Sequence, residues 1–173
     1  QLIKDEIDIL HTIGGDDTNI TAGKLLEFIA DKGYKIAVIG LPKTIDNDIY
    51  PIKQTLGSFT AADQTARFFR NIVNENTTSS RQLIIHEVMG RNCGWVTAYS
   101  AFLYNKSLDN KIFLPELNLS KEKWDIHAIY IPELDFDLRK ESKRLNLIMD
   151  NHDCVNIFLS EGAGLNIIIE EMK

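Results

Sequence analysis

The chain has 173 residues, of which 44% are hydrophobic and 25% are charged, as is usual for a soluble globular protein with one core. A net charge of -6 and an isoelectric point near 5.2 argue against a nucleic-acid partner, because non-specific binding requires a basic surface. The two cysteines, Cys93 and Cys154, fit neither a disulfide framework nor a zinc motif, which favours a reducing compartment. The sequence has no run of about 18 apolar residues and begins without a signal-peptide pattern, so we expect a cytoplasmic protein without a membrane segment.

Two strand-and-helix units are predicted in the first part of the chain. Residues 7–13 form a short apolar run that ends at two glycines, which is typical of a buried parallel strand. A helix is predicted from residue 18 or 19 to 32, with Gly33 as its end, and residues 35–41 predict the next buried strand. The stretch 42–58 is rich in Pro, Asp, Asn and Thr and is too long for an ordinary connection. Because long loops in compact domains are often functional, it is the first place to look for a site.

The same alternation of elements continues to the end of the chain. The predicted elements are a helix at 59–76, a strand at 82–88, a helix at 93–104, a polar connection at 105–125, a strand at 126–131, a helix at 137–151 and a strand at 155–160. This order predicts an α/β fold with a Rossmann-like, mostly parallel sheet and helices on both faces. Ligands bind such sheets beyond the carboxyl ends of the strands, so we expect four loops to gather there. These loops are 14–19, 42–48, 89–94 and 160–164.

The first loop combines two glycines with two carboxylates at the start of a helix. Gly14 and Gly15 let the backbone approach a phosphate closely, and Asp16 or Asp17 is suited to a metal that accompanies phosphate. A purely structural interpretation is also open, because Asp16, Asp17 and Thr18 are residue types that cap a helix and complement its dipole. The loop alone does not decide between the two.

The second loop, PKTIDND at 42–48, is harder to explain by structure alone. It places Lys43, Thr44, Asp46 and Asp48 directly after a buried strand. A lysine can neutralise charge on a transferring phosphoryl group, and an aspartate can accept the proton of an attacking hydroxyl. The alternative is a turn rich in Asx residues that carries a solvated cluster of charges.

The third and fourth loops carry weaker signals. Gly90 permits a close backbone approach and Arg91 is suited to an anionic sugar phosphate, whereas Glu161 could accept hydrogen bonds from sugar hydroxyls or cap a helix. The histidines show no metal-ligand spacing, and we interpret them as structural. They are His11, His86, His127 and His152.

Taken together, the four loops resemble the phosphofructokinase family. The similar segments are GGDDT at 14–18, PKTIDND at 42–48, EVMGRNCGW at 87–95 and SEGAG at 160–164, in the family's order and spacing. The resemblance covers essentially the whole chain and implies an incomplete phosphofructokinase fold. It also implies a single partial domain over residues 1–173, with the start of the sugar-phosphate-binding lobe after about residue 125.

The resemblance assigns roles to individual residues. It implies that Asp46 accepts the proton of the fructose 1-hydroxyl, with Thr44, Ile45 and Asp48 beside it in the substrate site. Asp16 would help to hold Mg²⁺, and the phosphates would lie against Gly14, Gly15 and Lys43. Fructose 6-phosphate would be bound by Met89, Gly90, Arg91 and Glu161.

Two positions imply pyrophosphate as the phosphoryl donor. Family members that use ATP usually carry glycine where this chain has Asp17 and Lys43. Asp17 would place a negative charge where the α-phosphate of ATP would lie, and like charges about 4 Å apart cost roughly 4 kcal/mol at an effective dielectric near 20. This corresponds to about a thousandfold discrimination. Lys43 would stabilise charge on the transferring or leaving phosphate, so we count Asp17 and Lys43 with Asp46 among the catalytic residues.

The expected activity is therefore reversible phosphoryl transfer from pyrophosphate to fructose 6-phosphate by an enzyme that is a homo-oligomer when complete. Two alternatives stay open: an ATP-dependent phosphofructokinase, and a catalytically silent fragment or binding subunit. Complete family members have another glycine-rich loop before the matched region and further basic residues after it. The family's arginine near the third strand has no clear equivalent, since Gln82 occupies that position and Arg81 precedes it.

Overall fold

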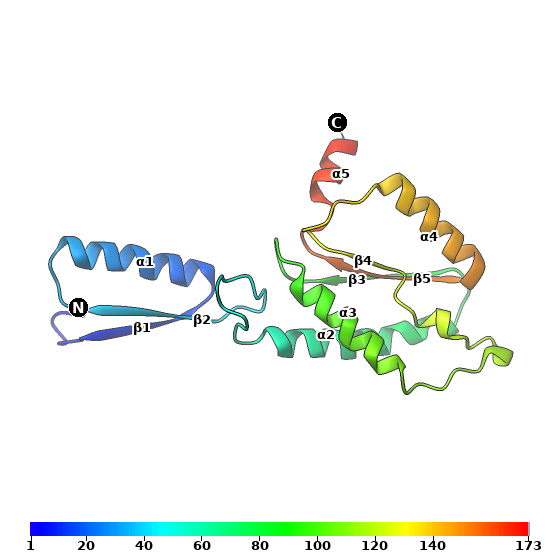
Figure 1. The fold of residues 1–173 in the computed structure, drawn as a ribbon, viewed down its shortest axis with the longest axis horizontal. Coiled ribbons are helices and arrows are strands. Elements are labelled where there is room, and N and C mark those ends of the chain that lie inside the picture. Colours follow the sequence, from blue (N-terminus) through cyan, green and yellow to red (C-terminus); the bar gives the residue numbers. More distant parts are fainter. Residues whose placement is uncertain (173) are drawn as a thin grey trace. The chain divides into compact units, whose positions relative to one another are not determined.

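The computed structural model describes residues 1–172. The chain divides into two compact units, Gln1–Ser58 (unit 1) and Phe59–Lys173 (unit 2), and each is described by itself (Figure 1). The expected single partial domain, with a second lobe starting after about residue 125, stays a prediction. Among the described residues, no helix combines the length and the apolar character that crossing a membrane requires.

Unit 1 contains one strand–helix–strand motif, formed by β1 (Ile9–Gly14), α1 (Asp16–Asp31) and β2 (Ala37–Pro42). The two strands are parallel and pair from Ile9 with Ala37 to Gly14 with Pro42. α1 packs along one face of this small sheet (Figure 1). Leu10 and Val38, which pair across the two strands, are half-buried. Side chains of alternating strand residues point to the other face, which is exposed in the described part of the chain.

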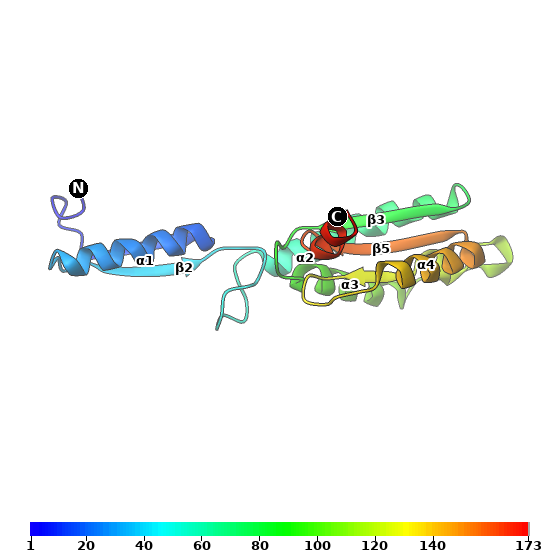
Figure 2. The same ribbon diagram turned by 90° about the horizontal axis from the view of Figure 1, so that it is seen from above.

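Unit 2 contains a three-stranded parallel sheet with the order β3–β5–β4. Its strands are β3 (Gln82–Val88), β4 (Ala128–Tyr130) and β5 (Cys154–Ser160). Its helices are α2 (Ser58–Ile72), α3 (Trp95–Leu108), α4 (Leu138–His152) and α5 (Leu165–Glu171), with the short helices η1 (Val73–Thr77), η2 (Pro115–Leu117) and η3 (Lys121–Lys123). Helices α2 and α3 cover one face of this sheet, and α4 covers the opposite face (Figure 1). All three run along the strands (Figure 2).

The main core of unit 2 lies between the sheet and the pair α2 and α3. Phe69, Tyr104 and Phe158 are fully buried there, and their rings pack edge to face with Phe69 at the centre. The centroid of Phe69 lies 4.7 Å from that of Tyr104 and 4.5 Å from that of Phe158. Burying a side chain of this size contributes about 2 to 3 kcal/mol to folding. A smaller apolar cluster, formed by Val155 and Ile157 with α4, fills the opposite face.

A buried pair of asparagines attaches the long polar connection 105–125 to the core. Asn76 Nδ2 donates to Asn156 Oδ1 at 2.7 Å and to the carbonyl of Lys123 at 2.8 Å. Asn156 Nδ2 in turn donates to the carbonyls of Lys123 and Asp125, at 3.1 and 2.9 Å. Because buried polar groups need such partners, this network fixes the path of the connection towards β4.

The predicted α/β class with parallel strands and helices is confirmed. The strands are divided between two sheets, and helices cover both faces only in unit 2. α1 begins at Asp16, two or three residues earlier than predicted, because Gly15 adopts an extended conformation and serves as the N-cap. α3 begins at Trp95 instead of residue 93, because the Cys93 amide closes a turn onto the Gly90 carbonyl. The terminal helix α5 was not predicted.

Candidate active site

The first glycine-rich loop joins β1 to α1 in unit 1. Gly14 is buried, and a Cβ atom at this position would lie 2.2 Å from the Thr18 hydroxyl, so only glycine fits. Asp16 and Asp17 occupy the first turn of α1, where negative charge interacts favourably with the helix dipole. Both carboxylates are exposed. Their position fits the structural interpretation and also leaves them accessible to a ligand.

Asn19 fixes this loop, a role that the sequence analysis missed. Its Nδ2 donates to the carbonyls of Gly14 and Gly15, at 3.0 and 2.9 Å. Because Asn19 lies in α1, these two hydrogen bonds attach the loop to the helix that follows it. The only signal in the sequence is an amide residue in the first turns of a helix, which is too common to identify such a role.

The second loop, PKTIDND, follows β2 and is bonded to the first. The backbone amide of Lys43 donates to the carbonyl of Gly14 at 2.7 Å. Parallel pairing of Gly14 with Pro42 brings the carboxyl ends of both strands to the same edge of the sheet. The GGDDT and PKTIDND loops are therefore neighbours, in agreement with the part of the expected four-loop arrangement that lies within unit 1.

The side chains of the second loop differ in exposure. Lys43 and Asp48 are exposed, whereas Thr44, Ile45 and Asp46 are partly buried. The Asp46 amide donates to the hydroxyl of Thr44 at 3.2 Å, which folds the chain back just before the carboxylate. The hydrogen bond gives this part of the loop a defined backbone path, while the exposed Lys43 and Asp48 fit both a ligand site and a turn with solvated charges.

The residues of this edge offer limited metal chemistry by themselves. Among the described residues, no three His, Cys, Asp or Glu side chains are grouped as a metal site. Asp16 and Asp17 are adjacent in the same exposed turn. Mg²⁺ typically uses one or two protein carboxylates and completes its shell with water and substrate phosphates, so this donor set suits Mg²⁺ bound together with a phosphate ligand.

In unit 2, Glu161 holds the third loop. Its Oε2 accepts hydrogen bonds from the amides of Gly90 and Arg91, at 3.3 and 3.2 Å. Arg91 has a positive φ of 50° and Gly90 one of 156°, so the chain turns sharply here, and the arginine is exposed. The carboxylate thereby stabilises a strained turn between β3 and α3.

The third and fourth loops are in close contact. A Cβ at Gly162 would lie 2.1 Å from the carbonyl of Arg91, and the Glu161 amide donates to the Val88 carbonyl at 2.9 Å. Glu133, another residue that the sequence analysis missed, accepts from the amide of Gly94 at 2.8 Å and holds the start of α3. Its only sequence signal is a carboxylate shortly after a predicted strand.

The predicted residues therefore fall into two groups. Unit 1 brings together Gly14, Gly15, Asp16, Asp17, Lys43, Thr44, Ile45, Asp46 and Asp48. Unit 2 brings together Met89, Gly90, Arg91 and Glu161. Each group lies at the carboxyl ends of its own strands, and the gathering of all four loops in one site stays a prediction.

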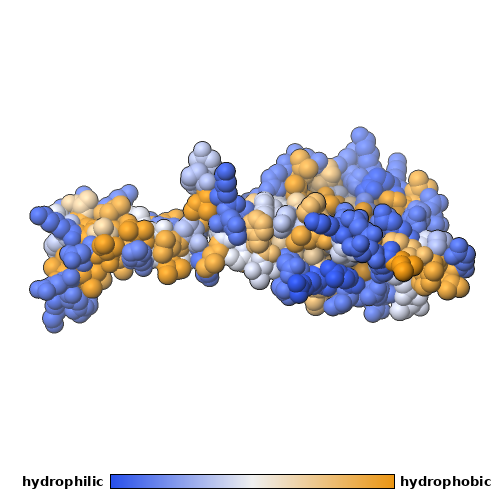
Figure 3. All heavy atoms as spheres, turned by 60° about the horizontal axis from the view of Figure 1, so that its bottom comes forward, coloured by the Kyte–Doolittle hydropathy of each residue, from blue (hydrophilic) through white to orange (hydrophobic). Residues whose placement is uncertain are grey.

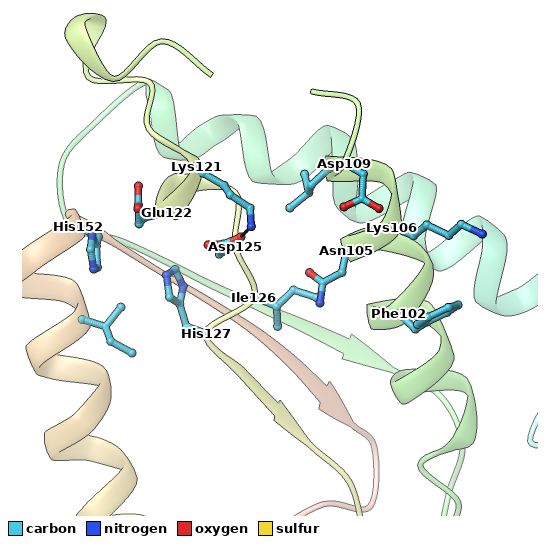
Figure 4. A pocket seen from close by; sticks show the side chains of 12 residues that line it. Phe102, Asn105, Lys106, Asp109, Lys121, Glu122, Asp125, Ile126, His127 and His152 are labelled. Atoms are coloured by element: carbon cyan, nitrogen blue, oxygen red, sulfur yellow. Dashed lines mark ion pairs between the residues drawn. The ribbon is translucent and has the colours of Figure 1, made fainter. Parts of the chain in front are cut away.

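The histidines of unit 2 lie away from these loops. His86 packs against Phe69 and Phe158, and its burial lowers its pKa. His127 precedes β4 and stacks on His152 at a centroid distance of 6.4 Å, and burial lowers the pKa of His127 as well. Both rings line a pocket of about 900 Å³ (Figure 4). In the lining of the same pocket, Lys121 Nζ lies 3.6 Å from the Asp125 carboxylate four residues later (Figure 4).

Parallel βα units with polar loops at the carboxyl ends of their strands define a Rossmann-like α/β protein. The family model described as Phosphofructokinase matches residues 1–173, and the chain belongs to the phosphofructokinase family.

Curated relatives agree with this assignment. A pyrophosphate–fructose 6-phosphate 1-phosphotransferase from Methylomonas methanica is 58% identical over 173 residues, and one from Mastigamoeba balamuthi is 55% identical over 172 residues. These matches cover 100% and 99% of this chain but 42% of each relative, so the chain spans about two fifths of their length. Relatives named ATP-dependent 6-phosphofructokinase are 28% to 35% identical.

A solved structure shows the same fold. The crystal structure of a pyrophosphate-dependent phosphofructokinase from Marinobacter aquaeolei aligns with a TM-score of 0.62 and 26% sequence identity. The alignment covers 99% of this chain and 42% of that chain.

Proposed function

We propose that the protein containing this chain transfers a phosphoryl group from pyrophosphate to the 1-hydroxyl of fructose 6-phosphate. The products are fructose 1,6-bisphosphate and phosphate, and the reaction is reversible. The observation that carries the proposal is the hydrogen bond from the Lys43 amide to the Gly14 carbonyl. It supports the proposal because it joins the backbone of the loop that carries Asp16 and Asp17 to that of the loop that carries Lys43 and Asp46. The chain is 58% identical to a relative named for this reaction.

The chemistry follows from the residue types at this edge. Asp46 accepts the proton of the fructose 1-hydroxyl while the oxygen of that hydroxyl forms a bond to a phosphorus of pyrophosphate. The bond from that phosphorus to the bridging oxygen breaks in line, and phosphate leaves with the electron pair. Lys43 offsets the negative charge on the transferred and leaving groups. Mg²⁺, held by Asp16 together with phosphate oxygens, would supply further charge neutralisation when bound.

The choice of donor is assigned to Asp17 and Lys43. Both side chains are exposed at the ends of β1 and β2, where a donor would approach. Helix N-termini commonly bind phosphate groups. Because Asp17 lies in the first turn of α1, its negative charge would repel the additional phosphate of a nucleotide at that position. An ATP-dependent reaction is the second candidate, and it is favoured only by the more distant relatives.

The sugar phosphate is assigned to the loops of unit 2. Arg91 is exposed and offers a forked cation to the 6-phosphate, with Met89 and Gly90 beside it. Glu161 uses one carboxylate oxygen for the amides of Gly90 and Arg91, and its other oxygen, which has no hydrogen-bond partner within the described part of the chain, would accept a bond from a sugar hydroxyl. This requires the loops of both units to meet around one substrate, which is part of the proposal.

Three further expectations belong to the same proposal. The complete enzyme is a homo-oligomer that acts in the cytoplasm, and neither nucleic acid nor a membrane is a partner. A catalytically silent fragment or binding subunit remains the alternative for a chain that spans 42% of its relatives. Turnover by the complete protein would exclude a silent subunit.

The role of Asp46 is tested by Asp46→Asn in the complete protein. We expect kcat with pyrophosphate to fall by about 10²- to 10⁴-fold, because the amide cannot accept the hydroxyl proton. Binding of fructose 6-phosphate, measured by calorimetry, should persist. The matched control is Asp31→Asn at the end of α1, where the carboxylate is exposed and far along the helix from the loop. Equal loss of activity in both variants would contradict the assignment.

A further inference from the structure

The segment after the PKTIDND loop folds back onto it. Residues 49–57 leave the loop and return at Thr55, just before α2 begins at Ser58. Thr55 is 1% exposed, so its side chain cannot reach a ligand. It lies nevertheless in contact with the residues on both sides of Asp46.

On one side, the hydroxyl of Thr55 holds Thr44. Oγ1 donates to the Thr44 carbonyl at 2.6 Å, and the Thr44 hydroxyl in turn accepts from the Asp46 amide at 3.2 Å. The Thr55 carbonyl is itself fixed, because it accepts a hydrogen bond from the buried hydroxyl of Ser58 at 2.9 Å. A short relay of hydrogen bonds therefore runs from the start of α2 to the backbone of the proposed base.

On the other side, the backbone of Thr55 holds Asn47. The Thr55 amide donates to Asn47 Oδ1 at 2.9 Å, and Asn47 Nδ2 donates to the Lys53 carbonyl at 3.4 Å. Asn47 has a positive φ of 58°, a conformation that costs energy for a residue with a side chain but is tolerated best by asparagine. The strained residue next to Asp46 is thus held by its own side chain.

We propose that Thr55 is a positioning residue for Asp46, acting through Thr44 and Asn47 as a clamp on both sides of the carboxylate. The inference rests on the proposed function of Asp46. The clamp fixes the backbone on both sides of Asp46 and thereby limits the positions that its carboxylate can occupy. Misplacement of a reacting group by about 1 Å can lower the rate about a hundredfold. The buried Thr55 hydroxyl therefore affects turnover through the position of Asp46, although it does not touch a ligand.

The test uses Thr55→Val, Thr55→Ser and the control Thr97→Val in the complete protein. Valine keeps the shape of threonine but removes the hydroxyl, whereas serine keeps it. Thr97 is also fully buried, and its hydroxyl has no hydrogen-bond partner among the described residues, so Thr97→Val makes the same chemical change without breaking a clamp. Rates are compared per mole of folded protein, with the folded fraction taken from thermal melts.

We expect Thr55→Val to lower kcat by about 10- to 100-fold while the KM values for both substrates change by less than about threefold. The acidic limb of its pH–kcat profile should be displaced, because the surroundings of Asp46 change. Thr55→Ser should restore kcat to within about threefold, and Thr97→Val should leave it unchanged. A Thr55→Val enzyme as fast as the Thr97→Val enzyme, or a Thr55→Ser enzyme as slow as Thr55→Val, would overturn the proposal.

Amide hydrogen exchange separates this inference from the proposed function. In Thr55→Val, the amides of Asp46 and Thr55 should lose protection relative to Thr97→Val. If the wild-type protein shows no turnover with either donor, the proposed function fails. In that case unchanged protection of the two amides would also reject the clamp, whereas lost protection would support it.

Discussion

At the residue scale, the carbonyl of Gly14 connects the two loops of unit 1. It accepts from Asn19 Nδ2 at 3.0 Å and from the Lys43 amide at 2.7 Å, while Asn19 also holds the Gly15 carbonyl. One side chain and one backbone amide therefore set the relative positions of the GGDDT and PKTIDND loops. A change at Asn19 should act on the phosphate site although Asn19 is not one of the predicted ligands.

Asn19→Ala should destabilise unit 1 by about 0.5 to 1.5 kcal/mol, because the carbonyls of Gly14 and Gly15 each lose one donor but keep a bond from a backbone amide. We also expect the KM for pyrophosphate to rise, since the first loop is then held less firmly. The control is Asn146→Ala, where an exposed asparagine of α4 donates to the carbonyl four residues earlier, as Asn19 does. The free energy of unfolding of both variants is measured in urea, and the KM for pyrophosphate by steady-state kinetics. Equal changes in these two quantities for both variants would contradict a special role for Asn19.

At the element scale, β3 carries a histidine into the aromatic core of unit 2. His86 lies 5.3 Å from Phe69 and 5.1 Å from Phe158 between ring centroids. Its Nε2 is buried without a hydrogen-bond partner among residues 1–172. Desolvation disfavours the charged imidazole, which lowers the pKa of His86 below its ordinary value.

Unit 2 should therefore lose stability on acidification. Below about pH 6.5 the unfolded chain binds a proton at His86 that the folded chain does not, so the free energy of unfolding falls until the lower folded pKa is reached. His127 acts in the same direction because burial also lowers its pKa. Replacing His86 by Leu should reduce this dependence without abolishing it.

The measurement is urea unfolding at pH 7.5 and pH 5.5, followed by a signal from unit 2. The control is His11→Leu, since His11 is exposed on β1 of unit 1. If His86→Leu and wild type lose the same free energy of unfolding between these two pH values, His86 is not the source of the effect.

The elements also show which parts of the fold a sequence can predict. β3 has the predicted bounds 82–88, because the apolar run 83–85, which includes two β-branched isoleucines, lies within it and turn residues follow it. The start of α1 was predicted too late because the sequence does not reveal that Gly15, and not Thr18, provides the extended N-cap. Loop identities followed from motifs, whereas the partners Asn19, Thr55 and Glu133 depend on contacts that no local pattern encodes.

At the scale of the whole molecule, unit 1 exposes an apolar sheet face. Ile9 and Ile13 are 54% and 64% exposed, and Ile39 and Leu41 are each 42% exposed on the neighbouring strand. Figure 3 shows apolar side chains gathered on the surface of this unit. The sequence predicted buried strands because both segments are short and largely apolar, but in the described chain α1 covers only one face of the sheet they form.

The choice between pyrophosphate and ATP as phosphoryl donor has to be tested on the complete protein. The most direct measurement is a coupled assay of the complete protein with fructose 6-phosphate and Mg²⁺, comparing pyrophosphate with ATP. We predict turnover with pyrophosphate and about a thousandfold lower kcat/KM with ATP, with Asp17→Gly narrowing that difference. Equal or better turnover with ATP would contradict the assignment of Asp17 and Lys43, and turnover with neither donor would contradict the proposed activity as a whole.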